Sequence, residues 1–385
     1  MIKDIFKFSS PIKLFLIVVC IISIIFIYLF SIKPQATKLL GRSQNTKKGV
    51  KTEKFVPKIP YFRASIPYWD QTAAFASFEK NVNLFNFVTV FWYALQSDGG
   101  IQKYSYAVED KTIITFAHEN NVKVFGLIAN LPDEDGSGSW DYRRVDKVIR
   151  TPEERSKHIE EIVTLVQEMN FDGISIDYEQ LKSSQKANFS VLIEQLATVL
   201  HSKGKLLGVA IHPKTGEGKP NENNGSAAQD LLALSKSADQ LYFMTYGEHW
   251  NESSPGPIAS ISWVKNVINY AISIGVPRKK IFMGIPLYGL DWPKMGSSYG
   301  TATGLTYSEV VSLIDQYKPK VAIDQQNSTA SFTYIDGGQN HEVWFENYQT
   351  VQTKLEFAKS LGISVTFWRL GGEDPQVWTT VGRYR

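Results

Sequence analysis

The stretch Phe171-Asp172-Gly173-Ile174-Ser175-Ile176-Asp177-Tyr178-Glu179 is the part of the sequence most informative about the fold. Residues two apart on a β-strand face the same side, so Ser175, Asp177 and Glu179 share one face. Ile174 and Ile176 point the other way, into apolar packing. Two acids within an apolar strand are costly to bury. We therefore interpret this strand as part of a functional site, with a structural ion pair to Lys or Arg as the alternative.

Seven other stretches have the same β-rich character, and several are near-continuous apolar runs, as expected for parallel strands buried on both faces. Helical patterns separate them, including Thr151–Met169, Lys186–Ser202 and Ile261–Ile274, the first of which begins with Thr151 as N-cap and Pro152 behind it. The predicted strands are Arg63–Tyr68, Leu84–Tyr93, Val122–Asn130, Gly173–Tyr178, Leu206–His212, Gln240–Tyr246, Ile281–Tyr288 and Ile363–Leu370.

Eight β/α units within residues 58–385 predict a (β/α)8 TIM barrel, an α/β fold whose active sites lie at the C-terminal ends of the strands. A doubly wound open sheet is the alternative, but no glycine-rich phosphate fingerprint follows the first strand. Residues 291–358 are too long for one helix. They contain a helical pattern, Tyr307–Tyr317, and two short strand patterns, which predict a small α+β insertion between strands seven and eight.

Composition excludes several classes of protein. The 41 Lys+Arg and 38 Asp+Glu residues give a net charge of +3, which is too weak to indicate nucleic acid as the principal partner. Cys20 is the only cysteine, so the sequence has neither a disulfide framework nor a cysteine-based zinc site. The six histidines lack a metal-ligand spacing. We expect no metal and no cofactor.

The N-terminal region predicts a membrane anchor. Residues 14–32 form a 19-residue apolar run between Lys13 and Lys33, about the length that a spanning helix needs. A cleaved signal peptide is the alternative. We expect a cytoplasmic tail at 1–13, a single-pass anchor at 14–32, a basic linker at 33–57 and an extracytoplasmic catalytic domain at the cell membrane. The positive-inside count alone favours the opposite orientation, but large domains translocate largely regardless of charge.

The acid-bearing strand resembles the DGxDxDxE motif of glycoside hydrolase family 18, the chitinase-like (β/α)8 enzymes. Asp172, Gly173, Asp177 and Glu179 match this motif, whereas Ser175 replaces the first Asp of its DxDxE core. Other matching segments are Met244-Thr245-Tyr246 on the sixth strand, Trp368 at the end of the eighth and the insertion-domain signature at 343–347. The runs at 284–289 and 255–260 are similar to bacterial members that act on the cell envelope, including spore-cortex hydrolases, although the sequence has none of the LysM modules usual in cortex enzymes.

The resemblance implies a substrate-assisted glycosidase. Glu179 is then the general acid, Asp177 orients the substrate's 2-acetamido group, and Tyr246 donates a hydrogen bond to it. Adjacent inward carboxylates push their pKa values apart, which keeps one of them protonated. Ser175 and Asp172 are supporting residues, and we expect Ser175 to hydrogen-bond Asp177. The candidate substrate-binding residues are Trp368 as the floor of the site, Met244, Tyr288, Trp92 and Glu248.

Gly247 stands where the family commonly has Asp or Asn, so Glu248 and His249, which follow it, are the candidates for the missing polar group. A loop carboxylate with no catalytic duty is equally consistent with the sequence.

The expected function is hydrolysis of β-1,4 bonds next to N-acetylglucosamine in peptidoglycan or a chitin-like polymer. The expected partners are therefore a polysaccharide of N-acetylated amino sugars and the membrane. Two alternatives remain open at this point. One is a catalytically weak glycan-binding protein on the same barrel, and the other is a membrane-tethered polysaccharide-processing factor with no turnover of its own.

Overall fold

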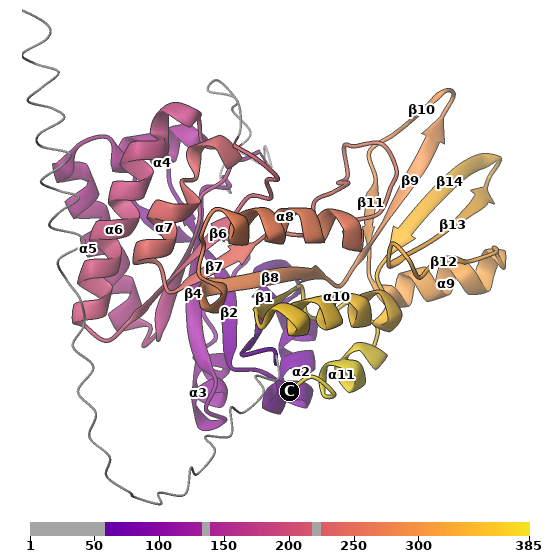
Figure 1. Ribbon diagram of the computed structural model, residues 1–385, viewed down its shortest axis with the longest axis horizontal. Coiled ribbons are helices and arrows are strands. Elements are labelled where there is room, and N and C mark those ends of the chain that lie inside the picture. Colours follow the sequence, from indigo (N-terminus) through magenta and orange to yellow (C-terminus); the bar gives the residue numbers. More distant parts are fainter. Residues whose placement is uncertain (1–57, 133–138, 218–224) are drawn as a thin grey trace, which may run out of the picture. The chain divides into compact units, whose positions relative to one another are not determined.

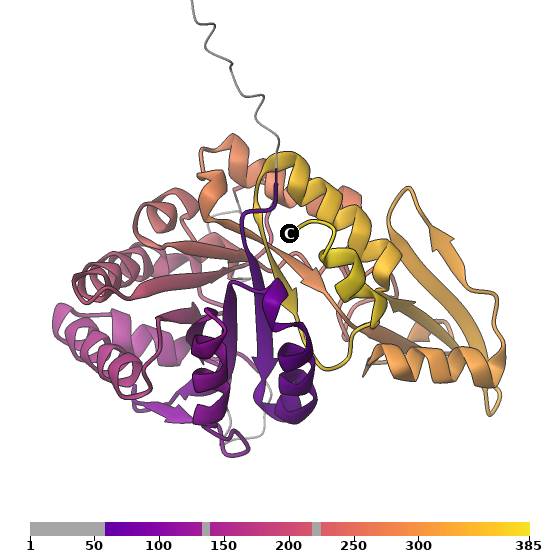
Figure 2. The same ribbon diagram turned by 90° about the horizontal axis from the view of Figure 1, so that it is seen from below.

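A computed structural model describes residues 58–385 except 133–138 and 218–224. Eight parallel strands form a closed barrel, because β1 pairs with both β2 and β15 (Figure 1). Figure 2 shows the indigo first strand beside the yellow last one. The barrel strands are β1 (Phe62–Pro67), β2 (Phe87–Leu95), β4 (Lys123–Ala129), β5 (Gly173–Asp177), β6 (Leu206–Ile211), β7 (Gln240–Phe243), β8 (Ile281–Pro286) and β15 (Ser364–Trp368).

The predicted barrel is confirmed, and each predicted strand overlaps an observed one. The largest difference at a C-terminal end is in the sixth strand, which was predicted to reach Tyr246 but ends at Phe243. Met244 still bonds to Ile211 of β6, and the chain then turns away from the ladder. A short strand not predicted, β3 (Ile101–Lys103), runs antiparallel beside the end of β2.

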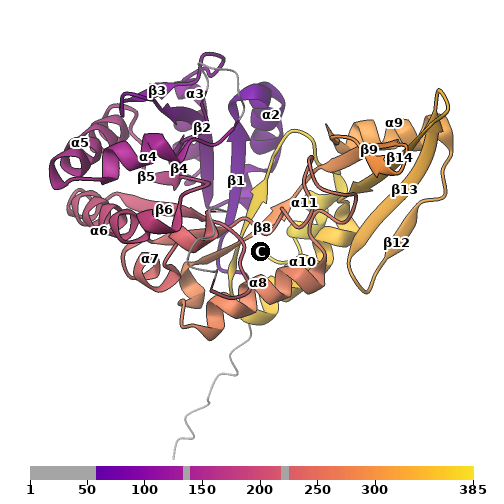
Figure 3. The same ribbon diagram turned by 90° about the horizontal axis from the view of Figure 1, so that it is seen from above.

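Helices cover the outside of the barrel (Figure 3), and their apolar faces meet the outward side chains of the strands in one large core. Helix α5 begins as predicted: the Thr151 side chain caps Glu154 N, and the Glu154 side chain returns to Thr151 N. The helices are α2 (Gln71–Asn81), α3 (Lys111–Glu119), α4 (Tyr142–Ile149), α5 (Pro152–Glu168), α6 (Lys186–Ser202), α7 (Leu231–Ser237), α8 (Ile261–Ser273), α9 (Tyr307–Tyr317), α10 (Tyr348–Leu361) and α11 (Gln376–Val381).

A second sheet of six antiparallel strands lies beside the barrel, between β8 and α10 (Figures 1 and 3). Helix α9 packs on one face of this sheet, where Val310 meets Phe332, Val343 and Phe345. The opposite face carries Leu290, Trp292 and Trp344, which pack with Tyr246 from the barrel. The strands are β9 (Gly289–Met295), β10 (Ser298–Tyr299), β11 (Thr303–Leu305), β12 (Ala322–Asp324), β13 (Thr329–Asp336) and β14 (Gln339–Phe345).

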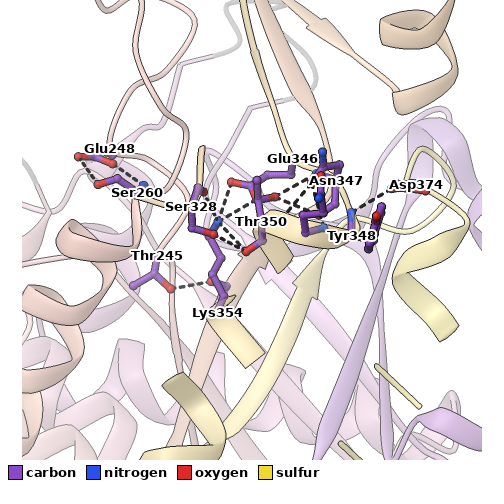
Figure 4. A network of polar contacts seen from close by, with 12 residues as sticks. Thr245, Glu248, Ser260, Ser328, Glu346, Asn347, Tyr348, Thr350, Lys354 and Asp374 are labelled. Atoms are coloured by element: carbon purple, nitrogen blue, oxygen red, sulfur yellow. Dashed lines mark hydrogen bonds and ion pairs between the residues drawn. The ribbon is translucent and has the colours of Figure 1, made fainter. Parts of the chain in front are cut away.

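A buried ion pair lies where this small sheet joins the barrel (Figure 4). Lys354 of α10 is fully buried, and its Nζ lies 2.9 and 2.8 Å from the two carboxylate oxygens of Glu346, which follows β14. The Thr350 hydroxyl donates to the same carboxylate. Asn347 caps α10 through Gln349 N and Thr350 N. The sheet is thus joined to the barrel by partners that satisfy both buried charges.

Across the described ranges, no helix is both long and apolar enough to cross a membrane. The predicted tail, span and linker at residues 1–57 lie outside those ranges.

Candidate active site

Strand β5 positions both candidate carboxylates at the C-terminal end of the barrel. Asp177 is its last residue, and Glu179 follows two positions later on the same face. Both side chains line a cavity of about 210 Å³. Of the residues predicted from sequence, the cavity brings together Asp177, Glu179, Met244, Tyr246 and Trp368. The remaining lining residues are Arg63, Ser65, Thr89, Phe91, Leu127, Trp140, Ala210, Tyr242 and Thr366.

A neighbouring strand holds the backbone of Glu179 in place. Asn130, directly after β4, is fully buried. Its Oδ1 accepts from Glu179 N at 2.7 Å, and its Nδ2 donates to Glu179 O at 3.0 Å. Because both bonds go to main-chain atoms, the carboxyl group of Glu179 stays available to the cavity. Glu179 is therefore held by β4 as well as by its own strand.

The two carboxyl groups carry perturbed pKa values. Burial, the charge of Asp177 and a hydrogen bond to Asp177 raise the pKa of Glu179 well above its ordinary value. Burial also raises the pKa of Asp177, to about 7, although the hydrogen bond from Glu179 and the charge of Arg63 oppose this rise. Asp177 Oδ1 is buried and has no hydrogen-bond partner among the described residues. The hydrogen bond between the two groups favours a proton on Glu179 over one on Asp177.

His212, which follows β6, lies on the other side of Glu179. Its Nε2 is 3.5 Å from Glu179 Oε2 and accepts from Gln180 N at 3.4 Å. Burial lowers the pKa of His212 to about 4, so the ring is neutral at neutral pH. Gly225 closes over this ring with φ +82°, and a Cβ there would lie 2.3 Å from Nε2. Neutral His212 adds no positive charge that would draw the proton away from Glu179.

The segment after β7 forms a third wall of the cavity. Met244 and Tyr246 line it, while Thr245 between them donates from Oγ1 to Gly284 O of β8 at 2.7 Å. Gly284 also makes room for the ring of Tyr246, since a Cβ there would lie 2.6 Å from Cε1. Burial and the charges of Asp177 and Glu179 raise the pKa of Tyr246 well above its ordinary value. The phenol therefore stays protonated and is a hydrogen-bond donor.

Aromatic rings form one side of the cavity. The ring of Trp368, the last residue of β15, stacks on Tyr246 with centroids 6.3 Å apart and planes 16° apart. Trp69, which is 49% exposed, meets Trp368 edge-on at 6.0 Å. Phe91 of β2 lies 6.2 Å from Trp368. Such flat apolar surfaces suit the C–H faces of sugar rings.

Two residues predicted for the site lie elsewhere. Asp172 precedes β5, at the opposite end of the barrel from Glu179, where it accepts from Val124 N at 2.8 Å and lies 2.8 Å from His118 Nε2. Trp92 is fully buried and donates from Nε1 to Gln71 at 2.6 Å. The register of β2 shifts between Phe91 and Tyr93, and Phe91 rather than Trp92 lines the cavity.

Tyr288 and Glu248 lie behind the cavity wall. The Tyr288 hydroxyl donates to Tyr246 O at 2.9 Å and so supports the loop that carries Tyr246. The Glu248 carboxylate accepts from Ser260 N at 2.6 Å and from Ser260 Oγ at 2.9 Å, as Figure 4 shows. These bonds attach the loop after β7 to the start of α8. Neither side chain is among those that line the cavity.

The main difference from the sequence-based expectation lies beneath Asp177. Ser175 was expected to hydrogen-bond Asp177, but its hydroxyl accepts from Arg63 Nη2 at 2.7 Å. Arg63 is on the interior face of β1 and only 2% exposed. Sequence reasoning placed Arg63 at the start of the first strand and assigned it no role. The sequence did contain a signal for Arg63. It lies two residues before Ser65 on β1, so the two side chains share the inward face of the strand.

Asn130 and His212 were also missed. Each was included as the last residue of a predicted strand. A polar residue at the C-terminal end of a barrel strand is a recognisable signal, because active sites of this architecture lie there. Within the described ranges, no three His, Cys, Asp or Glu side chains are grouped so as to hold a metal ion.

The sequence is similar to those of several known proteins. A sequence model of the glycosyl hydrolases family 18 matches residues 65–373. The chain is 28% identical over 312 residues to an uncharacterized glycosylase, YvbX, of Bacillus subtilis (strain 168), covering 80% of this chain and 88% of that protein. It is 28% identical over 333 residues to a cortical fragment-lytic enzyme of Bacillus anthracis, covering 85% of this chain and 74% of that one.

Solved structures share the fold. A chitinase from Chromobacterium violaceum ATCC 12472 superposes with a TM-score of 0.75 at 28% identity, covering 84% of this chain and 98% of that one. The spore cortex-lytic enzyme SleL of Bacillus cereus superposes with a TM-score of 0.75 at 23% identity, covering 85% of this chain and 75% of that one.

Proposed function

The chain belongs to the glycosyl hydrolases family 18 and is a glycoside hydrolase, and on this premise we propose that it cleaves glycosidic bonds next to N-acetylated amino sugars by substrate-assisted catalysis. The observation that carries the proposal is the pair Asp177 and Glu179, which are hydrogen-bonded to each other and have raised pKa values at the wall of an aromatic-lined cavity. The pair fits a general acid beside a carboxylate that remains charged.

In the first step, Glu179 donates its proton to the glycosidic oxygen. The bond from that oxygen to the anomeric carbon breaks, and the leaving sugar departs as an alcohol. The carbonyl oxygen of the substrate's own 2-acetamido group forms the new bond to the anomeric carbon, which gives an oxazolinium ion. Burial and the charge of Asp177 raise the pKa of Glu179. Glu179 therefore retains this proton until substrate binds.

Asp177 and Tyr246 act on the acetamido group. The Asp177 carboxylate accepts from the acetamido N–H and stabilises the positive charge that develops there. The Tyr246 phenol donates to the acetamido oxygen and directs it toward the anomeric carbon. In the second step, ionised Glu179 takes a proton from water, the water oxygen bonds to the anomeric carbon, and the oxazolinium ring opens.

We take the substrate to be a bacterial wall polymer or a chitin-like polymer. A cortical fragment-lytic enzyme and a chitinase are both among the similar proteins. Both kinds of polymer present a 2-acetamido sugar, which the reaction requires.

The substrate test compares matched polymers. The full chain should release sugars from N-acetylated chitin oligomers or peptidoglycan, but not from fully deacetylated glucosamine polymer of equal length. A thiazoline analogue of the oxazolinium ion should inhibit competitively. A covalent glycosyl adduct on any carboxylate of β5 would overturn the mechanism, since Asp177 would then be the nucleophile. Binding of both polymers with no release of sugar would instead favour the glycan-binding alternative.

The proposed location is outside the cytoplasmic membrane, with residues 14–32 as the anchor. Protease added to intact cells should then remove the barrel. Complete protection of the barrel in permeable-walled spheroplasts would contradict this location and would argue against a wall substrate.

A further inference from the structure

Arg63 is a buried cation with an unusual set of partners. Its Nε donates to Thr89 Oγ1 at 2.6 Å, its Nη1 to Gln240 Oε1 at 3.3 Å and its Nη2 to Ser175 Oγ at 2.7 Å. The guanidinium carbon lies 3.4 Å from the centre of the Tyr242 ring. All of these partners are neutral. In the described part of the chain, no carboxylate lies within ion-pair distance of the guanidinium.

A buried charge without a counter-ion is costly, so the nearest buried anion matters. Ser175 and Asp177 face the same way on β5, two residues or roughly 7 Å apart along the strand. Arg63 binds Ser175, which places the guanidinium directly below Asp177 in the barrel interior. Arg63 and Asp177 both line the same cavity. A buried cation and a part-buried carboxylate, whose Oδ1 is buried and has no partner among the described residues, therefore lie about one strand repeat apart.

Four titratable groups surround Asp177. Glu179 on the same strand donates a hydrogen bond to it, and Tyr246 lies beside it after β7. His212, after β6, is neutral and lies next to Glu179 rather than Asp177. Arg63 on β1 is the cation among these four; burial lowers the pKa of its guanidinium, and the charges of Tyr246 and Asp177 oppose that fall. Among the described residues, it is Arg63 whose charge favours the ionised form of Asp177.

We propose that Arg63 is a positioning residue that holds Asp177 ionised from below, so that the shared proton stays on Glu179. This proposal rests on the proposed function for its catalytic meaning, because the mechanism needs a charged Asp177 and a protonated Glu179. In this chain the family's first motif aspartate is replaced by Ser175, and the serine hydroxyl connects the cation to the strand. The group below Asp177 is therefore the positively charged guanidinium of Arg63, where the family motif would place the carboxylate of its first aspartate.

The test measures the ionisation of Asp177 directly and does not depend on turnover. The full chain is labelled with ¹³C at Asp and Glu carboxyl groups and titrated by NMR, with the Asp177 signal assigned by its loss in Asp177→Asn. Arg63→Gln retains a hydrogen-bond donor without the charge, and Arg63→Lys retains the charge. A unit charge roughly 7 Å away at an effective dielectric of about 20 changes a carboxyl pKa by about one to two pH units.

We expect the Asp177 pKa to rise by about one to two pH units in Arg63→Gln and to stay near the wild-type value in Arg63→Lys. The acid limb of the pH profile of kcat/KM should move to higher pH by a similar amount. Arg155→Met removes another buried guanidinium, on the outer helix α5, which donates to Ile149 O of α4 and Gln195 of α6, and should leave the Asp177 pKa unchanged. Equal Asp177 pKa values in Arg63→Gln, Arg63→Lys and the wild type would overturn the proposal.

Ser175→Asp provides a second test that keeps Arg63 in place and remains available if the Arg63 variants do not fold. The new carboxylate pairs with Arg63 and offsets its charge, so the Asp177 pKa should rise there too. No rise would count against the proposal. If the wild type hydrolyses no N-acetylated polymer while the Asp177 pKa still responds to Arg63, the proposed function fails and the role of Arg63 stands.

Discussion

Two of the carboxylate sites in this molecule are built in opposite ways. Glu346, at the root of the small sheet, has Lys354 Nζ against both of its oxygens and Thr350 as a further donor. Asp177 and Glu179, at the end of β5, are hydrogen-bonded to each other, and no cation among the described residues contacts either carboxyl group, because His212 beside Glu179 is neutral. Burial raises the pKa of all three groups, but at Glu346 both Lys354 and Thr350 oppose the rise.

The difference shows how a structural acid is separated from a catalytic one. A buried carboxylate with its full set of partners has its charge satisfied, and it contributes to stability only as long as the partners remain. A buried pair left short of partners costs stability and retains a proton that it can transfer. The contrast gives four expectations, which follow from the largest effect to the smallest.

Glu179→Gln should give the largest effect, on activity alone. Without a proton donor for the leaving oxygen, turnover should fall by about 10²- to 10⁴-fold. Because its folded-state pKa is raised, Glu179 destabilises the fold as pH rises from the unfolded pKa through the folded one. Glutamine removes that penalty, so the variant's melting temperature at neutral pH should equal or exceed that of the wild type. A clearly lower melting temperature in Glu179→Gln would indicate that Glu179, like Glu346, is an acid that stabilises the fold.

Lys354→Met should give the converse result. Glu346 would remain buried without its cation, which costs about 3–5 kcal/mol of unfolding free energy. The loss should shrink at low pH, where Glu346 is protonated in both the folded and the unfolded state. Urea unfolding at pH 4 and pH 7 measures both values. If kcat below the melting transition fell along with stability, the two sites would not be independent.

Asp177→Asn tests the coupling within the catalytic pair. The charge of Asp177 raises the pKa of Glu179, so its removal should move the alkaline limb of kcat/KM to lower pH. The maximum rate should also fall, because the lost charge is needed chiefly as positive charge develops on the substrate. A pH–rate profile from pH 4 to pH 9 gives both results. An alkaline limb that stayed in place would indicate that Glu179 titrates independently.

Ser260→Ala should give the smallest effect. Its hydroxyl caps α8 and donates to Glu248, which is a partly exposed carboxylate. Losing such a cap costs about 1 kcal/mol. Thermal unfolding would detect this change, and KM for the polymer should remain near the wild-type value. A several-fold rise in KM would show that Glu248 acts on substrate through the loop after β7.

The sequence was sufficient to predict the barrel. A buried parallel strand can be recognised as an apolar run, and the start of a helix can be recognised by its capping residue. It was sufficient for Asp177 and Glu179, because a period of two fixes which residues share a face. Two residues were misplaced. Trp92 alternates with Phe91, which lines the cavity, and so packs in the core, and Asp172 precedes β5 at the opposite end of the barrel from Glu179.

Contacts between distant strands could not be predicted from a local pattern. Arg63 and Ser175 are brought together only by closure of the barrel, and nothing near either residue in the sequence indicates the other. The same is true of Asn130, whose amide holds the backbone of Glu179 from the adjacent strand. His212 lies beside Glu179 for the same reason. The sequence signals the positions of Arg63, Asn130 and His212, but their partners are known only from the folded structure.

The pairing of β1 with β15 has a consequence for the order in which the site comes into existence. β15 supplies Thr366 and Trp368 to the cavity, and β1 supplies Arg63. Their pairing closes a loop of roughly 300 residues, and β15 is the last barrel strand to leave the ribosome. Asp177 and Glu179 are synthesised long before Thr366 and Trp368. The cavity therefore lacks part of its wall until β15 docks against β1.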